Sequence, residues 1–406
     1  MERRVSMLSD FDTGAFSVTQ LCARYGISRD VFYDWQGRRL GGAQDWFADR
    51  SHATLNCPHK TAGEVAARVI AVRRRFPHFG PKKVRAWLAR EQPGTAWPAP
   101  STIGDILKAA GLVEALPRRR RAVEQGLVVS PARAANEEWC ADFKGWFLTG
   151  DGARCDPLTL TDSHCRYNLD TRITPPTLGG VWPVFLAAFQ AHGLPGAIRV
   201  DNGTPFGSRG PAGLSRLSVW WLRLGVQPRF IPPASPQDNG RHERFHRTLK
   251  AQTTKPPSPT LAEQQVQFDR FRQHYNLERP HEALKQATPA SLWTPSPRPF
   301  PERLNEPDYA ADHQVRRVRP AGDIKWKGEN LFIGEAFAGQ LIGIADHDDG
   351  LHIVRFCGVD LGVINRRRAF LRFAPLRHRL REAQEGPAKQ KLSTISPVQS
   401  VDHQTG

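Results

Sequence analysis

Cysteine, methionine and acidic residues are all in short supply in this chain of 406 residues. Its 6 cysteines are scattered without a close pair, which is typical of a reducing compartment rather than of a disulfide framework. His52, Cys57 and His59 cluster loosely, but no second ligand pair follows at zinc-finger spacing, so a zinc site there is disfavoured.

Long apolar runs are also missing. The best run, 181–189, is far shorter than the roughly 20 residues that a membrane-spanning helix needs. The N-terminus, Met1-Glu2-Arg3-Arg4, carries charge without the apolar segment of a signal peptide behind it. We therefore expect a soluble, cytosolic protein.

The shortage of acids leaves the chain strongly basic. Lys and Arg number 57 against 40 Asp and Glu, for a formal net charge of +17. Such a surplus indicates an anionic partner, nucleic acid first and a membrane surface second. A basic protein whose charge merely keeps it soluble is the alternative.

Residues 1–50 are predicted to form a helix-turn-helix. Gly26 supplies the turn and Ser28 caps the second helix. The apolar residues expected to face inward are Val18, Leu21 and Cys22 on the first helix and Val31, Phe32 and Trp35 on the second. Arg29 and Tyr33 would point outward near the start of a recognition helix as candidate DNA contacts. An ordinary helical hairpin without a role in DNA binding is the alternative.

Residues 60–115 are predicted to form a second helical, helix-turn-helix-like module. Its helices are expected over 64–75, from Pro81, and from Pro100 to Gly111. A basic linker, 116–134, follows. It contains a run of cations that could lie along a phosphate backbone: Arg118, Arg119, Arg120 and Arg121.

Residues 135–297 change to alternating strands and helices. The elements expected in chain order are strands at 138–147, 157–162 and 167–174, a helix at 181–191, a strand at 197–201, a helix at 214–224, a strand at 228–231, and helices after 239 and from 261. Asp151-Gly152 indicates a hairpin turn. Three antiparallel strands followed by this alternation describe a mixed sheet with helices on its faces.

Residues 298–375 are predicted to be all-β. Six short strands separated by Gly and Asp turns favour a small barrel, and 376–406 is expected to be a disordered polar tail. The fold class is thus multidomain α+β.

Three acids stand where an acid is conspicuous. Asp142 lies inside an apolar strand, Asp201 ends another, and Glu243 sits in a basic helix. If the three converge, their mutual repulsion calls for a divalent cation, and oxygen ligands with open positions suit Mg²⁺. Two such ions about 3.5–4 Å apart serve phosphoryl transfer.

Each acid taken alone also has an ordinary interpretation. Asp142 could be a solvated edge-strand acid, Asp201 the first residue of a turn, and Glu243 an acid favoured by the helix dipole. The rival acids nearby are more simply turn residues: Asp151, Asp156 and Asp162. The order of the three acids along the chain is what favours a shared site.

Several sequence blocks carry a family resemblance. They are 139–145, 157–167, 200–206, 239–250 and 268–290, with the elements Asp-Asn-Gly, Asn-Gly-x-x-Glu-Arg and Tyr-Asn-x-x-Arg-Pro-His in that order. In these blocks the chain resembles bacterial insertion-sequence transposases of the DDE, retroviral-integrase-like superfamily.

The resemblance implies an RNase H-like catalytic core. It also implies Mg²⁺-dependent cleavage and transfer of DNA strands, with two ions and Mn²⁺ as a possible substitute. The catalytic and metal-binding residues would be Asp142, Asp201 and Glu243. The DNA phosphates would be held by Lys250, Arg247 and Arg244. Expected partners are double-stranded DNA, from transposon ends and target, and further copies of the chain that pair two ends, with no membrane, in the nucleoid region of a bacterial cytoplasm.

Two departures from the family pattern are visible. The interval between Asp201 and Glu243 is longer than usual, and the extra length is expected in a loop at 207–213. Arg241 and His242 add positive charge and bulk where smaller residues are common. Two other functions remain open: a DNA-binding regulator or inactive, domesticated copy, and a structure-selective nuclease on the same core.

Overall fold

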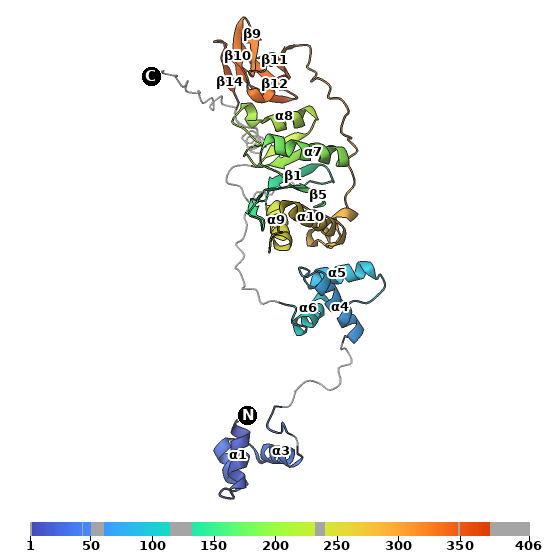
Figure 1. Cartoon of the computed structure of the whole chain (residues 1–406), viewed down its shortest axis with the longest axis vertical. Helices are drawn as coiled ribbons and strands as arrows, with labels where there is room; N and C mark the ends of the chain where they lie inside the picture. The colour runs from blue at the N-terminus through green and yellow to red at the C-terminus, as the bar shows by residue number, and fades with distance from the viewer. Residues whose placement is uncertain are drawn as a thin grey trace, which may run out of the picture. The chain divides into compact units, whose positions relative to one another are not determined.

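The computed structural model describes residues 2–42, 44–49, 61–113, 132–231, 240–347 and 350–373. The linker arginines 118–121, the Pro-rich stretch 232–239, the candidate zinc cluster and the tail 376–406 lie outside these residues. The chain divides into two compact units, 1–62 and 63–406, whose elements are labelled in Figure 1. Among the described residues, no helix is long and apolar enough to cross a membrane.

The first unit is a cluster of three helices, α1 (Glu2–Asp12), α2 (Val18–Tyr25) and α3 (Arg29–Leu40). Gly26 takes the left-handed conformation (φ 64°) that ends α2, and Ser28 caps α3 by accepting from the Val31 amide. The core consists of Met7, Leu8, Leu21, Cys22 and Phe32.

The sequence-based prediction missed α1, whose Met7 and Leu8 close this small core. The inward placement of Val31 is wrong, because 37% of that residue is exposed. Phe32, the next residue, takes the core-facing position on α3 and is fully buried. Neighbouring residues on a helix are about 100° apart, so the two cannot both face a narrow core.

The second unit begins with α4 (Gly63–Arg75), α5 (Pro81–Glu91) and α6 (Pro100–Ala109). Their shared core is formed by Val69, Val72, Phe76, Phe79, Val84, Leu88, Trp97, Ile103 and Leu107. Arg75 pairs with Glu278, and the His274 ring stacks on Phe76 at 5.0 Å between centroids. These contacts join the helical segment to the end of α10 (Leu261–Gln273).

A mixed five-stranded sheet forms the centre of this unit, as predicted. Its strands, in spatial order, are β5 (Asn168–Ile173), β4 (Pro157–Asp162), β1 (Glu138–Phe143), β6 (Ala197–Val200) and β7 (Gln227–Phe230). β1 runs antiparallel to β4 and parallel to β6, and β6 runs parallel to β7.

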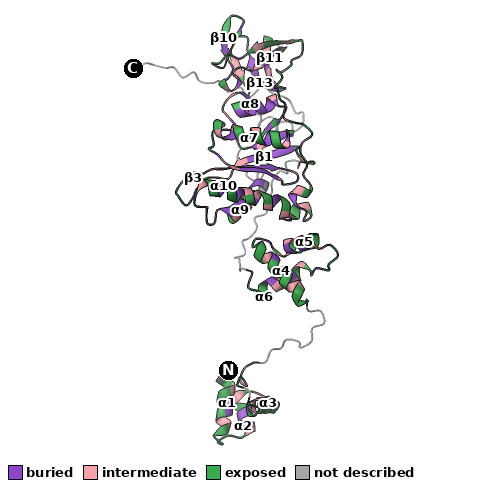
Figure 2. Cartoon of the chain, turned by 45° about the vertical axis from the view of Figure 1, so that its right-hand side comes forward, coloured by how far each residue is buried: buried purple, intermediate pink, exposed green. Residues whose placement is uncertain are grey.

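Helices cover both faces of the sheet. α7 (Leu178–His192) and α8 (Arg216–Arg223) lie on one side, and α9 (Gly240–Thr253) and α10 on the other (Figure 1). Trp139 and Ala141 of β1 are buried in the cluster with α7 and α8. Because side chains alternate along a strand, Asp142 faces α9. Burial is concentrated in the central strands, while the helices are exposed on their outer faces (Figure 2).

A short hairpin follows β1. It pairs β2 (Phe147–Leu148) with β3 (Arg154–Cys155), and Gly152 turns the chain with φ 79°. The Asp151-Gly152 turn is therefore confirmed, but the predicted strand 138–147 is interrupted. It ends at Phe143 because Gly145 (φ 88°) breaks the extended backbone.

The C-terminal β-strands form an open sheet, so the predicted barrel is wrong. The sheet order is β14 (Phe370–Arg372), β13 (Val359–Ile364), β12 (Leu351–Phe356), β11 (Leu341–His347) and β8 (His313–Arg317), and a separate hairpin pairs β9 (Asp323–Trp326) with β10 (Glu329–Phe332). Within the described residues β14 and β8 are edges that do not pair with each other. Closure is unnecessary because the apolar face is covered instead by α8.

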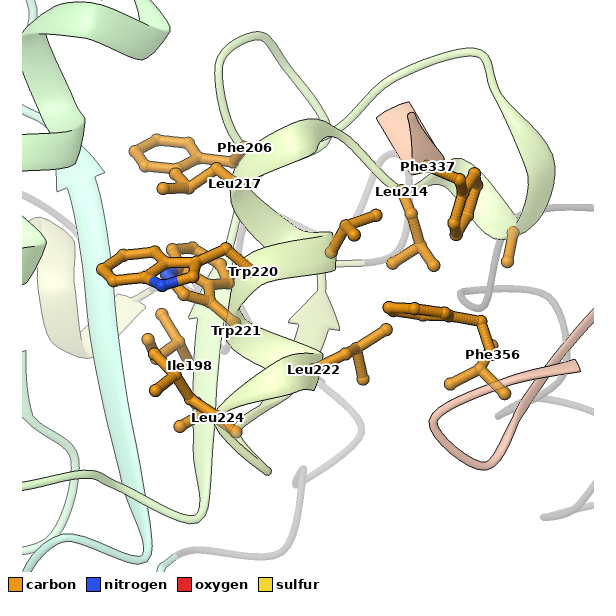
Figure 3. Close-up of a cluster of buried hydrophobic side chains, with 14 of the residues drawn as sticks. Ile198, Phe206, Leu214, Leu217, Trp220, Trp221, Leu222, Leu224, Phe337 and Phe356 are labelled. Carbon is orange, nitrogen blue, oxygen red and sulfur yellow. The ribbon is translucent and has the colours of Figure 1, made fainter. Parts of the chain in front are cut away.

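The contact with α8 makes one hydrophobic core of the central mixed sheet and the C-terminal strands. Phe337 and Phe356 face Leu214 and Leu222 (Figure 3). Both phenylalanines are fully buried and pack edge to face, with centroids 5.4 Å apart. We therefore expect the two sheets to unfold together.

Replacing Phe356 by Ala tests this shared core. Removing a fully buried ring destabilises a protein by about 3–5 kcal/mol. In urea unfolding followed by far-UV circular dichroism, we expect one transition at a lower midpoint. Phe332→Ala, in the same region but 59% exposed, should change stability by less than about 0.5 kcal/mol. A separate early transition in Phe356→Ala would show instead that the C-terminal strands unfold independently.

Candidate active site

Asp142 and Asp201 lie at the carboxyl ends of two adjacent strands. β1 and β6 are parallel, with Cys140 beside Arg199. The β1–β6 pairing ends at these residues, and the same register continued by two positions predicts Asp142 beside Asp201, which directly follows β6. Neighbouring strands are about 4.8 Å apart. We therefore expect the two carboxylates that the sequence singled out to lie near each other at the carboxyl edge of the sheet.

The Asp201 carboxylate is poorly compensated by the protein. Its residue reaches solvent, yet partial burial raises the pKa of the carboxyl above its ordinary value, opposed by a hydrogen bond from the Gly203 amide to Oδ1 (3.2 Å). Proximity to a cation would lower this pKa and favour the charged form. The environment of Asp201 thus suits a carboxylate whose charged form is stabilised by a bound cation.

Glu243 stands in the first turn of α9, the helix that covers Asp142. It is exposed, as are Arg244, Arg247 and Lys250 along the same helix. Another face of α9 buries Phe245 and Leu249 against α10. The helix therefore shows its acid and its cations to solvent while it is held by an apolar face.

A hydrogen-bond hub centred on Thr159 joins α9 to the strand that carries Asp142. Thr159 lies directly opposite Asp142 in the β1–β4 pair. Its hydroxyl donates to the Asp142 carbonyl (3.0 Å) and lies 2.7 Å from His242 Nε2 and 2.8 Å from His246 Nε2. The hydroxyl of Thr161 is 3.1 Å from His242 Nδ1.

The hub fixes the protonation of both histidines. A threonine hydroxyl has a single hydrogen, and here the Asp142 carbonyl accepts it, so Thr159 can only accept from the two rings. His242 and His246 must each donate from Nε2–H. His242 Nδ1 then accepts from Thr161. All of these polar groups are satisfied without an ion.

Burial keeps both rings neutral. It lowers the pKa of His242 well below the ordinary value, helped by His246, and burial with Lys144 lowers the pKa of His246 to about 3. The expected positive charge of His242 near Glu243 is therefore wrong. The ring is 2% exposed, points into the protein and carries no charge.

Asp142, His242 and His246 have the composition of a metal site, since one ligand atom from each lies within 4.8 Å of the others. The Thr159 oxygen, however, occupies the point between the two Nε2 atoms at hydrogen-bond distances. Zinc–nitrogen bonds are about 2.0–2.1 Å long. We therefore interpret the group as a hydrogen-bond hub. The sequence signal that could have revealed it is the pair of histidines at i and i+4 on either side of Glu243.

The rival acids have structural partners. Asp151 accepts from the Thr149 hydroxyl (2.6 Å) inside the hairpin turn, and Asp156 pairs with Arg154. Asp162 is buried and accepts backbone N–H groups from three residues: Asn136, His164 and Cys165. Each of these three acids is therefore used in a local hydrogen bond or ion pair.

The remaining predicted DNA contacts lie in the first unit or outside the described residues. Arg29 and Tyr33 are both exposed on α3, and Arg29 donates to the Thr19 hydroxyl (2.8 Å).

Thr159→Val tests the hub through stability. The substitution leaves two buried imidazole N–H groups without an acceptor, and each such loss costs about 1–3 kcal/mol. We expect thermal unfolding at a clearly lower Tm. Thr159→Ser keeps the hydroxyl and loses one methyl, so it should lower the free energy of unfolding by only about 1 kcal/mol. Equal destabilisation by both variants would mean that packing, not hydrogen bonding, matters at this position.

Comparison with known proteins identifies relatives of the chain. Residues 224–289, which include Glu243, match the family model "Integrase core domain", and residues 313–369 match "IS481 family transposase, C-terminal domain". The uncharacterized 31.7 kDa protein of insertion element IS407 from Burkholderia multivorans is 28% identical over 239 residues, which cover 56% of this chain and 80% of the relative. The 39.2 kDa protein of IS476 from Xanthomonas euvesicatoria is 24% identical over 280 residues, covering 68% and 72%.

Solved structures with a detectable likeness include retroviral integrases. The HTLV-2 integrase catalytic core domain in complex with magnesium, in its trimeric form, is 14% identical with a TM-score of 0.32, covering 39% of this chain and 97% of that chain. The simian T-cell lymphotropic virus intasome in complex with PP2A regulatory subunit B56 gamma is 16% identical with a TM-score of 0.36, covering 74% and 100%. The two family matches and the insertion-element relatives confirm the resemblance seen in the motifs: this chain is similar to insertion-sequence transposases and carries a segment that matches an integrase core domain.

Proposed function

We propose that the chain binds transposon-end DNA and catalyses its cleavage and transfer with Asp142, Asp201 and Glu243. The observation that supports the proposal is the parallel β1–β6 pairing, which, continued by two residues beyond Cys140 and Arg199, would bring Asp142 beside Asp201. Support also comes from α9, which carries Glu243 and is hydrogen-bonded to the strand of Asp142 through Thr159.

If the three carboxylates converge at this edge, they would fit a divalent cation, because their oxygens are the ligands that Mg²⁺ and Mn²⁺ prefer. Burial raises the pKa of Asp201, and a bound cation would oppose that rise. When bound, a pair of Mg²⁺ ions supplies Lewis acidity that activates the attacking oxygen and stabilises the leaving one. The protein's own contribution is to hold the three carboxylates in place through the strand register and the hub.

Both reactions replace one phosphorus–oxygen bond by another. In cleavage, a water oxygen bonds to phosphorus as the bond to the 3′-oxygen breaks, and the proton lost by the water balances the one that the 3′-oxygen gains to become a hydroxyl. In transfer, that hydroxyl attacks a phosphodiester of the target DNA and displaces another 3′-oxygen. One site can therefore perform both reactions.

The cations of α9 are proposed to hold the DNA backbone. Arg244, Arg247 and Lys250 are exposed along the helix that carries Glu243. Burial, and secondly Lys250, lowers the pKa of Lys144, so two ammonium groups lie close enough to repel each other. A DNA phosphate between them would relieve this repulsion.

The helical segments are proposed to recognise the DNA, and further copies of the chain to pair its two ends. In this proposal residues 1–50 are a helix-turn-helix domain that presents Arg29 and Tyr33, and 60–115 a second module joined by the basic linker 116–134. Residues 135–297 form the catalytic core, and 298–375 the all-β domain.

Removing a carboxylate tests the assignment of the triad. We expect Asp142→Asn, Asp201→Asn and Glu243→Gln each to reduce Mg²⁺-dependent cleavage and joining by at least about 100-fold, because the bound metal supplies several kcal/mol of transition-state stabilisation. We expect inverted repeats to flank the coding region, and the assay uses a duplex of that repeat. DNA affinity, measured by fluorescence anisotropy, should change little.

Glu263→Gln is the matched control for Glu243→Gln. Glu263 is an exposed acid in the first turn of α10 and has no place at the carboxylate edge. The Glu263→Gln variant should cleave DNA at the wild-type rate. A triad variant that keeps its activity removes that residue from the site, and DNA binding without cleavage in the wild-type protein would favour the regulator instead.

Thr159→Val should also alter catalysis through the position of Glu243. With the hub broken, α9 is less firmly held over β1, and carboxylates that are poorly placed bind metal more weakly. Loss of such a supporting group typically weakens metal affinity about 10–100-fold. We expect a higher Mg²⁺ concentration for half-maximal cleavage in Thr159→Val, recovery in Thr159→Ser, and unchanged DNA affinity. An unchanged Mg²⁺ requirement would limit the hub to a role in stability.

A further inference from the structure

Trp146 is a large aromatic residue exposed close to the carboxylate edge. It keeps 59% of its surface exposed and follows Asp142 by four residues, a span of at most about 14 Å of chain. Phe147 packs inward, partly buried against Phe245 and Leu249 of α9. Because side chains alternate, its neighbours Trp146 and Leu148 point outward.

A chain of contacts holds the Trp146 ring in place. The Arg154 guanidinium lies over the ring, 5.3 Å from its centroid. Arg154 in turn makes two hydrogen bonds of 2.8 Å to the carboxylate of Asp156. This bidentate pair fixes the plane of the guanidinium, and the guanidinium fixes the ring beneath it. The indole is thus oriented before any partner arrives.

The hairpin that carries these residues is tied to the helices of the site. The amides of Gly150 and Asp151 donate to the carbonyls of Ser258 and Pro259, both at 2.9 Å. A Cβ atom on Gly150 would lie 3.1 Å from Pro259 Cα, so the two segments are in close contact. The exposed ring therefore has a defined position relative to α9 and Glu243.

A cation lies directly over the ring, the Arg154 guanidinium. Lys144, two residues before Trp146, adds a second positive group, with its Nζ 5.1 Å from the centroid of the neighbouring Phe147 ring. An exposed indole among cations matches the pattern by which proteins bind unpaired nucleic-acid strands, with bases on aromatic rings and phosphates on Lys and Arg.

We propose that Trp146 is a stacking platform for an unpaired nucleobase at the end of the bound DNA. The inference rests on the proposed function, since a strand enters a carboxylate site more readily when it is separated from its partner. Strand separation breaks the stacking of the terminal bases. Stacking of a base on an aromatic side chain recovers about 1–3 kcal/mol of this lost interaction free energy per base. Stacking does not read sequence, so the platform accepts any terminal base.

Binding to forked DNA tests the platform. The probe is a 20-base-pair duplex with an arm of three unpaired nucleotides, one of them the fluorescent base 2-aminopurine, and the comparison is the fully paired duplex of the same sequence. Measurements on the full chain without divalent cations keep the strands intact. We expect the wild-type protein to quench 2-aminopurine and to bind the forked DNA more tightly than the paired duplex.

In Trp146→Ala, affinity for the forked DNA should fall by about 5–150-fold, the factor that corresponds to 1–3 kcal/mol. The quenching should disappear, and affinity for the paired duplex should stay unchanged. Trp146→Phe keeps a ring and should retain most of the preference. Leu148→Ala removes the other outward side chain of β2, which is 50% exposed, and should behave as wild type.

The proposal is overturned if Trp146→Ala binds forked DNA as tightly as wild type with the same quenching. It is equally overturned if forked and paired DNA weaken together, or if only the oligomeric state changes, which would make Trp146 a contact between copies. A failure of the proposed function would be recognised separately. A wild-type protein that quenches 2-aminopurine but cleaves no transposon end would contradict the transposase function and would still support base stacking on Trp146.

Discussion

The pairing of β1 with β6 is the constraint on which the candidate site depends. Side chains alternate along a strand, so a slip of one residue would turn Asp142 toward the apolar cluster under α7 and move it away from Asp201. At the other end of β1, ion pairs of Glu138 stabilise the observed register against such a slip. It is 1% exposed, and its carboxylate pairs with Arg199 of β6 and Arg229 of β7, each at 2.8 Å. The buried Glu138 thus links three strands through ion pairs. The expected positions of Asp142 and Asp201, at the far ends of β1 and β6, depend on the alignment that these ion pairs stabilise.

Much of the fold followed from local patterns in the sequence. The strand and helix order of the core could be predicted because apolar periodicity changes at Gly, Pro and Asp turns, and Asp201 could be placed at a strand end for the same reason. Asp142 was expected inside a longer strand and lies one residue before the end of β1. The barrel could not be predicted correctly, since closure depends on whether two edge strands meet. Here the strands cover their apolar side with α8 instead, a contact between residues such as Leu222 and Phe356 that are far apart in sequence.

The hub was missed for a related reason. Thr159 is an unremarkable strand residue, and the histidines of α9 look like extra charge beside Glu243 until their partners are known. Burial reverses that interpretation: a ring with 2% exposure and two hydroxyl partners is neutral and structural. Tertiary contacts determine whether a histidine is a charge, a ligand or a hydrogen-bond donor, and sequence spacing alone cannot separate the three.

The geometry of α9 explains how one basic helix serves several roles. Its residues are about 100° apart around the axis, so Phe245 and Leu249 can bury one side while His242 and His246 reach Thr159 on an adjoining side. The remaining arc carries Glu243, Arg247 and Lys250 into solvent. Because the apolar side and the two histidines already fix the rotation of the helix, the acid and the cations need no partners of their own to be held in position. They can therefore stay exposed to solvent, as the proposed binding of a metal ion and of DNA phosphates requires.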